Sequence, residues 1–281
     1  MPSLADHQSN NFTKVLLLGD AKSGKTTALA SLVEADYELF IIDMDNLLDP
    51  LKHAVLARCP EKIGNVHFTT LRDRRKATKG GMVIEGTPKA FTKAVSMIDE
   101  WKDAEGDFGR PDEWGPGRIL ILDSLSRFCD AAYDFRDMIA PAGRSGEKDG
   151  RAVYGDAQDA VESALAHLTS DTFRTNVIVI CHGQYMDLPD KTTKIFPQGV
   201  GQKLSPKIPQ YFPTYIRLVN KAGKRTFQLR STAMIDLAFP PTSLDEDVSA
   251  DDGLAKIFAA LRPQAPVASA TKPKSLTLRR V

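Results

Sequence analysis

The feature that most constrains this chain is an apolar run that ends in a glycine-rich turn. Residues 14–18 read Lys-Val-Leu-Leu-Leu, and the pattern G-x-x-x-x-G-K-T follows at once. Glycines let the backbone curl so that successive N–H groups point inward, where they can bind the oxygens of a phosphate chain. Apolar residues at helical spacing come after the turn. The order of strand, glycine-rich loop and helix predicts a P-loop that binds the triphosphate of a nucleotide.

The residues of this loop supply the backbone donors, a cation and a hydroxyl. Lys25 offers a mobile positive charge to the β- and γ-phosphate oxygens, and the hydroxyl of Thr26 can ligate Mg²⁺. The pattern therefore predicts that ATP and Mg²⁺ are the cofactors. The predicted contacts to the nucleotide come from Gly19, Asp20, Ala21, Lys22, Ser23, Gly24, Lys25, Thr26 and Thr27.

Three further apolar runs have the length of buried strands, at residues 38–45, 118–124 and 176–182. Continuous apolar strands separated by helical segments predict a mainly parallel twisted sheet with helices on both faces. Residues 215–219 and 225–230 alternate in polarity around a short turn, which indicates a C-terminal antiparallel hairpin. The predicted fold is an α/β P-loop NTPase domain over residues 13–262, between a flexible N-terminus (1–12) and a disordered basic tail (263–281).

Carboxylates follow two of the predicted strands. In parallel sheets, ligands bind at the carboxyl ends of the strands. Asp123 follows four apolar residues, as a Walker B aspartate does, and would hold Mg²⁺ together with Thr26; the alternative is a cap for the next helix. Since Ser124 rather than Glu follows it, the carboxylate that orients the attacking water should come from elsewhere. Asp45 is the preferred candidate and Asp43 the next; the alternative is that both cap a following helix that begins at Asn46–Leu48.

Polar side chains also end the fourth strand. His182 and Gln184 come directly after the apolar run and could sense the γ-phosphate. The alternative for His182 is a histidine that packs at the rim of the core. The predicted catalytic set is therefore Lys25, Asp45, Asp123, His182 and Gln184.

The overall charge limits the partners. There are 37 Lys and Arg residues against 36 Asp and Glu, a net charge of +1, so any site for a polyanion must be a local patch. The apolar runs are too short to span a membrane, and the N-terminus lacks the apolar core of a signal peptide. Three widely spaced cysteines fit a reducing interior and offer no metal-ligand spacing. The sequence predicts a cytoplasmic protein with no membrane partner.

The motifs together resemble those of one family. A P-loop, an acid at the end of the next strand, a Walker B run that ends in Asp-Ser, and a strand that ends in His and Gln resemble the RecA-type ATPase core over roughly residues 14–231. The short phage-type members of the RecA superfamily, proposed as single-strand annealing recombinases, are the most similar. The AAA+ pattern, with Asp-Glu after the Walker B strand, is absent. The resemblance implies a DNA-dependent ATP hydrolase that promotes annealing or recombination, in the cytoplasm of a bacterial host if phage-encoded.

The resemblance also implies where single-stranded DNA would bind. In RecA-type cores the loops after the third and fourth strands line the DNA channel, and by position these match residues 134–156 and 186–210. The later loop has four lysines against two aspartates, a net of +2, whereas the earlier loop has four cations against five acids, a net of −1. The predicted DNA contacts are Lys191, Lys194, Lys203 and Lys207. Residues 72–79 form the densest positive cluster, either as a second DNA contact or as a solvated turn.

Members of this family complete each ATP site with a neighbouring subunit. The resemblance therefore implies a homo-oligomer, as a ring or a filament, with Lys203 and Lys207 as the candidates for reaching across, and a single-strand binding protein as a further partner. Asp45 is one methylene shorter than the usual Glu, which predicts slow turnover. No helical DNA-binding domain precedes the P-loop, which argues against the usual filament.

Three alternatives remain open from the sequence. A nucleotide-gated DNA-binding or loader protein with weak hydrolysis needs the same motifs, and a helicase or packaging motor shares the core. A small-molecule kinase is disfavoured because residues 134–156 lack the dense arginines of a lid that grips phosphate.

Overall fold

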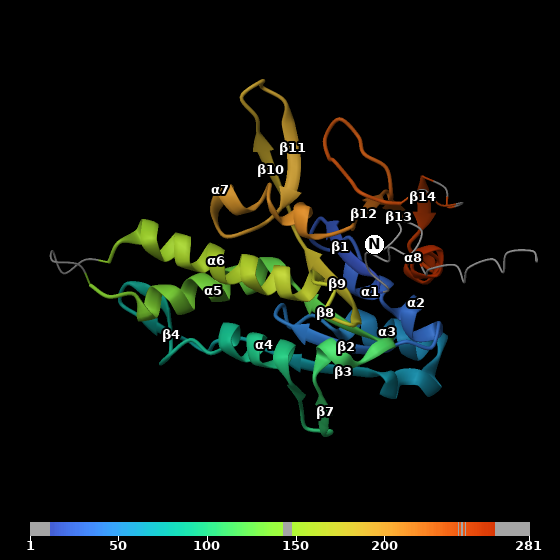
Figure 1. The fold of residues 1–281 in the computed structure, drawn as a ribbon, viewed down its shortest axis with the longest axis horizontal. Helices are drawn as coiled ribbons and strands as arrows, with labels where there is room; N and C mark the ends of the chain where they lie inside the picture. Colours follow the sequence, from blue (N-terminus) through green and yellow to red (C-terminus); the bar gives the residue numbers. More distant parts are fainter. Residues whose placement is uncertain (1–11, 143–147, 241, 243, 245, 262–281) are drawn as a thin grey trace, which may run out of the picture.

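A single large sheet runs through the protein. The structure is a computed structural model that describes residues 12–142, 148–240, 242, 244 and 246–261. The strand order is β14-β13-β12-β1-β9-β8-β2-β3 (Figure 1). The strands are β1 (Lys14–Gly19), β2 (Glu38–Asp43), β3 (Val66–Thr70), β8 (Gly115–Asp123), β9 (Thr175–Cys181), β12 (Thr214–Lys221), β13 (Lys224–Gln228) and β14 (Asp247–Ser249).

The six strands from β12 to β3 are parallel to one another. The inner ones are buried on both faces, which explains their continuous apolar runs. Strand β9 lies between the P-loop strand β1 and the Walker B strand β8. Because all six strands point the same way, the carboxyl ends of β1, β2, β8 and β9 meet at one edge of the sheet. Ligands of parallel sheets bind at this edge.

Helices cover both faces, and successive side chains of each strand alternate between the two layers. One core packs Leu16, Leu18 and their neighbours against α4 (Ala90–Asp99), α5 (Leu125–Ile139) and α6 (Gly150–Thr169). The other packs Val15 and Leu17 against α1 (Lys25–Ala28), α2 (Ala30–Glu34), α3 (Asp49–Arg58) and α8 (Gly253–Leu261). The predicted α/β class, with a mainly parallel sheet, two helical layers and the C-terminal β12–β13 hairpin, is confirmed.

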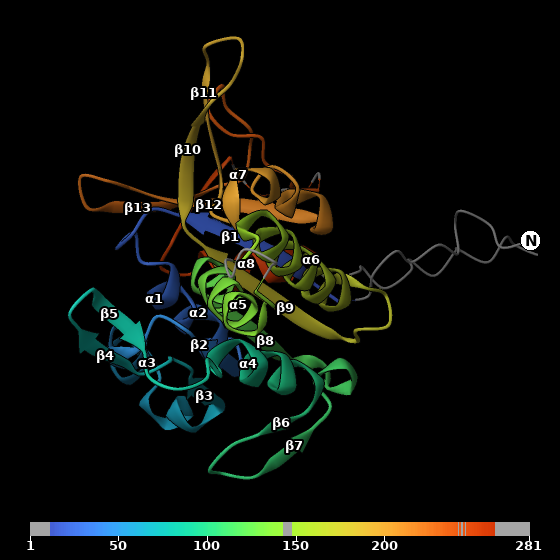
Figure 2. The ribbon, with the colours of Figure 1, turned by 90° about the vertical axis from the view of Figure 1, so that its left-hand side faces the viewer.

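The two long loops predicted at residues 134–156 and 186–210 are largely helix and strand in the structure. Within residues 134–156, helix α5 continues to Ile139 and α6 begins at Gly150, because the Asp149 carboxylate caps its first turn. Gly150 and Gly155, both within α6, hid the second helix from propensity reasoning. Within residues 186–210, β10 (Gly183–Asp187) and β11 (Thr193–Pro197) form an antiparallel hairpin that projects from the sheet (Figures 1 and 2), followed by α7 (Gly201–Leu204) and the 3₁₀ turn η4 (Ile208–Tyr211).

The basic cluster at residues 72–79 lies mostly on a second exposed hairpin, made of β4 (Arg75–Thr78) and β5 (Gly81–Ile84). The remaining elements are β6 (Trp101–Lys102), β7 (Asp107–Gly109) and the 3₁₀ turns η2 (Pro60–Asn65) and η3 (Pro111–Glu113). The predicted flexible N-terminus, apart from residue 12, and the predicted tail at 263–281 lie outside the described residues. In the described part of the chain, no helix has the length and apolar character needed to cross a bilayer.

Candidate nucleotide-binding site

The loop after β1 has the backbone that a phosphate nest requires. Gly24 has φ 99° and Lys22 has φ 61°, so the chain reverses its curl twice within the loop. A Cβ at Gly19 would lie 2.7 Å from Ser23 Oγ and 2.9 Å from the Leu218 carbonyl oxygen, so only glycine fits there. The Ser23 hydroxyl is buried and has no hydrogen-bond partner among the described residues. The loop is thus shaped for a bound polar group, which fits the phosphates of ATP.

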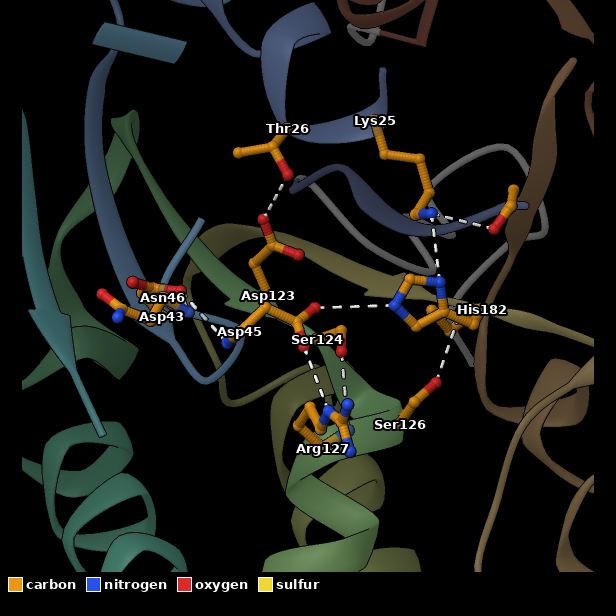
Figure 3. Close-up of polar contacts among 12 residues, drawn as sticks. Lys25, Thr26, Asp43, Asp45, Asn46, Asp123, Ser124, Ser126, Arg127 and His182 are labelled. Atoms are coloured by element: carbon orange, nitrogen blue, oxygen red, sulfur yellow. Dashed lines mark hydrogen bonds and ion pairs between the residues drawn. The ribbon is translucent and has the colours of Figure 1, made fainter. Parts of the chain in front are cut away.

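Lys25 lies folded back over this loop (Figure 3). Its Nζ donates to the carbonyl oxygens of Gly19 at 2.8 Å and Asp20 at 3.0 Å. Burial lowers the pKa of Lys25, and the negative charges of Asp123 and Asp45 oppose that shift. The Nζ of Lys25 is held by neutral carbonyl oxygens, which a charged phosphate oxygen would outcompete.

Thr26 and Asp123 meet at the predicted metal position. The Thr26 hydroxyl donates to Asp123 Oδ2 at 2.6 Å. Burial raises the pKa of Asp123 to about 6, and the hydrogen bond from Thr26 opposes the shift. Mg²⁺ commonly takes one or two protein oxygens and completes its shell with phosphates and water, and the Thr26 hydroxyl and the Asp123 carboxylate can supply those oxygens. The residues present fit the ion.

The two aspartates at the end of β2 have different environments. Asp43 Oδ1 accepts hydrogen bonds from the backbone N–H groups of Asp45 at 3.1 Å and Asn46 at 2.7 Å, and its Oδ2 accepts one from the Thr70 hydroxyl at 2.8 Å. Asp43 is buried and caps the turn at Asp45 and Asn46, whereas the alternative interpretation expected both aspartates to cap a helix there. Asp45 instead faces the centre of the site, 3.4 Å from Arg127 Nε.

His182 connects Asp45 to the P-loop lysine. Its Nε2 lies 3.5 Å from Asp45 Oδ2, and its Nδ1 lies 3.4 Å from Lys25 Nζ. A neutral imidazole with its proton on Nε2 satisfies both contacts, donating to the carboxylate and accepting from the ammonium group. Burial alone would raise the pKa of Asp45, but hydrogen bonds with His182 and Ser124 and the charge of Arg127 leave that pKa below its usual value. Asp45 therefore stays ionised at neutral pH.

The structure does not bring Gln184 into this network. The residue lies in β10, at the base of the hairpin, and its side-chain oxygen accepts a hydrogen bond from Ser205 at 3.5 Å. The other four predicted catalytic side chains, Lys25, Asp45, Asp123 and His182, converge at the carboxyl edge of the sheet.

Four residues at this edge were missed by sequence reasoning. Two of them lie in the first turn of α5. The Ser126 hydroxyl accepts a hydrogen bond from the His182 backbone N–H at 3.1 Å, and Arg127 pairs with the Asp45 carboxylate. Arg217 and Arg225, from the C-terminal hairpin, lie against the P-loop. The first pair could have been suspected because it directly follows the Walker B strand. The second depends on β12 pairing with β1, which no local pattern announces.

The four predicted DNA-binding lysines lie in two environments. Lys191 is exposed at the tip of the β10–β11 hairpin and Lys203 is exposed on α7; neither pairs with a carboxylate of the described residues. Lys194 pairs with Asp236 at 2.6 Å, and Lys207 pairs with Glu162 at 3.0 Å. The lysines lie on and beside one projecting hairpin rather than in a single patch.

Comparison with known proteins gives the family. The sequence model of a family described as an AAA domain matches residues 11–236, which is most of the chain, so the chain belongs to this family. It does so without the Asp-Glu pair of the AAA+ pattern, since Ser124 follows Asp123. No curated protein matches the chain. The family and the geometry of the site together define a P-loop ATPase domain.

Among solved structures, similar chains include two ATPase proteins. One is the ATPase EscN of the enteropathogenic E. coli type III secretion system, solved with its central stalk EscO; it is 13% identical, with a TM-score of 0.39, over 74% of this chain and 42% of that one. The other is the ATP synthase subunit NeqB of Nanoarcheaum equitans, 12% identical, with a TM-score of 0.37, over 87% of this chain and 52% of that one. The chain thus matches about half the length of each.

Proposed function

We propose that this P-loop ATPase binds single-stranded DNA and uses Mg²⁺-dependent ATP binding and hydrolysis to promote annealing or recombination. The observation that carries the proposal is the continuity between the ATP site and the projecting hairpin. His182, which contacts both Lys25 and Asp45, is followed at once by β10, the first strand of the hairpin. A change at the γ-phosphate therefore has a direct covalent path to the hairpin.

The chemistry assigned to each residue follows from its position. Lys25 would leave the carbonyl oxygens that it now contacts and neutralise the phosphates, while Thr26 and Asp123 would hold Mg²⁺, which supplies further charge neutralisation when bound. Asp45, ionised and aimed at the centre of the site, would orient the attacking water. His182 would respond to the phosphate through the same two contacts that it makes here.

The hairpin has the surface chemistry of a sequence-tolerant single-strand binder. Tyr185 is exposed on β10, so one aromatic side chain is available to stack on bases, whereas Phe196 is half-buried and lies on the opposite face of the hairpin. Lys191 at the tip and Lys203 on α7 pair with no carboxylate in the described part of the chain, in contrast to Lys194 and Lys207. With a net charge of +1, affinity for DNA must come from such local contacts.

A nucleotide-gated binding or loader protein is the second candidate, because of one feature of Asp45. Its carboxylate is already held by Arg127 and His182, and its side chain is shorter than that of the usual Glu, both of which restrain it from approaching a water molecule. In this alternative, ATP binding moves the hairpin, and hydrolysis only resets it slowly.

The experiment that tests the proposal is the ATPase rate with and without a single-stranded oligonucleotide. We expect single strands to raise the ATPase rate of the wild type by at least about tenfold. They should not raise the rate of Lys25→Ala, because the phosphates of bound ATP lack their main cation in that variant. Tyr185→Ala should abolish the stimulation and preserve the basal rate. Equal rates with and without DNA, together with nucleotide-dependent DNA binding, would favour the loader. If the protein binds no DNA at low salt with a non-hydrolysable ATP analogue, both the recombination ATPase and the loader are excluded.

Assembly is a proposal of the same kind. A head-to-tail ring or filament would let a lysine of one copy reach the ATP of the next. Lys203 suits that role better than Lys207, since Lys207 is engaged by Glu162. Light scattering with ATP and DNA present should give a mass well above 30.8 kDa.

A further inference from the structure

The C-terminal hairpin contacts the P-loop from the side opposite β9. Strand β12 pairs with β1 in parallel, so that Gly19 lies opposite Leu218 and the turn of the hairpin passes the phosphate nest (Figure 2). Arg217 Nη2 lies 3.5 Å from Asp20 Oδ2, within the loop itself. The Nε of Arg217 is buried and has no hydrogen-bond partner among the described residues. A guanidinium group with an unsatisfied buried donor thus faces the loop.

Arg225, on the neighbouring strand β13, lies directly against the nest. An ideal Cβ at Gly24 would be 3.1 Å from Arg225 Nη1 and 3.2 Å from both its Cδ and its Cζ, so the side chain runs along the loop at that residue. The backbone of Arg225 is fixed by its pairing with Asn220 and by its carbonyl, which accepts a hydrogen bond from the Ala250 N–H at 3.0 Å. The described residues offer its guanidinium no carboxylate within ion-pair distance.

We propose that Arg225 binds the nucleotide in cis, through the α- and β-phosphates, and that Arg217 positions the loop through Asp20. The inference rests on the proposed nucleotide binding and assigns a further residue to it. In a P-loop the backbone N–H groups around Gly24 cradle the α- and β-phosphates, and Lys25 reaches the β- and γ-phosphates. A guanidinium group at Gly24 is therefore close to the part of the phosphate chain that ADP retains, and its planar fork suits phosphate oxygens.

This position predicts a particular energetic signature. A residue that contacts only the α- and β-phosphates stabilises ATP, the transition state and ADP to the same extent. Its loss should raise KM and leave kcat nearly unchanged. That behaviour is opposite to the one expected for Asp45, and it differs from that of a cation that reaches the γ-phosphate, which would discriminate ATP from ADP.

The test measures the affinity of the full-length chain for ADP and for a non-hydrolysable ATP analogue, each with Mg²⁺, by calorimetry. Arg225→Ala should weaken both by about tenfold, the loss expected for one charge-assisted hydrogen bond. Arg225→Lys should recover part of that loss. Lys224→Ala is the matched control, because it removes the same charge from the adjacent residue, whose side chain points to the opposite face of the strand.

Each outcome decides the inference. Unchanged affinities in Arg225→Ala, an effect confined to the ATP analogue, or an equal effect in Lys224→Ala would overturn it. Arg225→Gln repeats the test if thermal melting shows that the alanine variant is unfolded. The proposed nucleotide binding fails separately: the wild type would then bind neither nucleotide, or Lys25→Ala would bind both as tightly as the wild type.

Discussion

Two buried lysines flank strand β1 and have opposite surroundings. Lys14, at the start of the strand, is 1% exposed; its Nζ donates to the carbonyl oxygens of Phe173 and Thr175, both at 2.7 Å, and lies 4.5 Å from the centroid of the Phe173 ring. Lys25, in the helix that follows the P-loop, is 6% exposed, and the charges of three carboxylates oppose the lowering of its pKa by burial. Burial lowers the pKa of both, that of Lys14 to about 7.

The difference shows that β1 has two kinds of end. We call the end at Lys14 the structural end, and the end at the P-loop, near Lys25, the chemical end. A neutral Lys14 amine has two N–H bonds, and the two carbonyl oxygens accept both, so nothing is left for a ligand. Lys25 contacts carbonyl oxygens as well, but negative side chains and a histidine surround it, and the loop beside it holds the Ser23 hydroxyl, which has no hydrogen-bond partner among the described residues. Strong acceptors such as phosphates belong at that end.

The largest effect should come from the chemical end, at the residue expected to orient water. Asp45→Asn should lower the ATPase rate by about a hundredfold and leave ATP affinity intact, because the carboxylate matters only for the hydrolytic step. Asp130→Asn is the matched control, since that carboxylate also pairs with Arg127, at 3.0 Å, but is exposed. Single-turnover kinetics measure the step. A wild-type rate in Asp45→Asn would move the catalytic role to another residue.

At the structural end we expect an effect on stability that depends on pH. The pKa of Lys14 is about 7 in the folded chain, against 10.5 for an exposed lysine. Between these values the unfolded chain binds a proton that the folded chain does not, so the free energy of unfolding should rise with pH, by up to about 1.4 kcal/mol per unit. Lys14→Met should lose this component.

Urea unfolding of both proteins at pH 7, 8 and 9 measures the difference. The free energy of unfolding of the wild type should rise relative to that of Lys14→Met as the pH rises. ATP affinity should be the same in both proteins at each pH. Parallel curves would mean that Lys14 remains charged in the core and that the comparison between the two lysines is wrong.

The smallest effect should come from the lysines that extend the chemical end toward DNA. Each phosphate contact contributes about −0.7 to the slope of log K against log salt for single strands. Lys191→Ala and Lys203→Ala should each reduce the slope by about that amount, and Lys194→Ala by less, because Asp236 already neutralises it. Lys102→Ala, which removes a cation from the β6–β7 region away from the hairpin, should change nothing (Figure 1). Fluorescence anisotropy across salt concentrations tests this, and equal slopes in all variants would exclude the hairpin.

Local patterns were enough to predict the frame of the fold. The apolar runs of β1, β2, β8 and β9 and the alternating hairpin are set by burial on one or two faces, which leaves a direct trace in the sequence. The hairpin at β10–β11 was missed, although Tyr185 and Ile195 flank a Pro-Asp turn with alternating polarity. The many polar residues there resemble those of a loop, because most residues of the hairpin are exposed or only half-buried.

For the site, the sequence could predict the residues that lie at strand ends. It could predict few of the contacts between side chains of different elements. The convergence of Asp123 with Thr26, and of His182 with Asp45, follows from parallel strands ending at one edge. The burial of Lys14 and the position of Arg225 beside Gly24 depend on contacts between segments far apart in the chain. No periodicity records such contacts, so a lysine that opens a strand and an arginine on a hairpin both look solvent-exposed in sequence.

Titration of Mg²⁺-ATP into the wild type, Lys25→Ala and Lys14→Met by calorimetry tests most directly whether the chemical end of β1 is the nucleotide site. Both variants remove one buried lysine next to the same strand, so general damage to the sheet should appear in both. We expect Lys14→Met to bind ATP like the wild type and Lys25→Ala to bind at least about a hundredfold more weakly, because the β- and γ-phosphates lose their main cation. Equal ATP affinity in the wild type and Lys25→Ala would contradict the account.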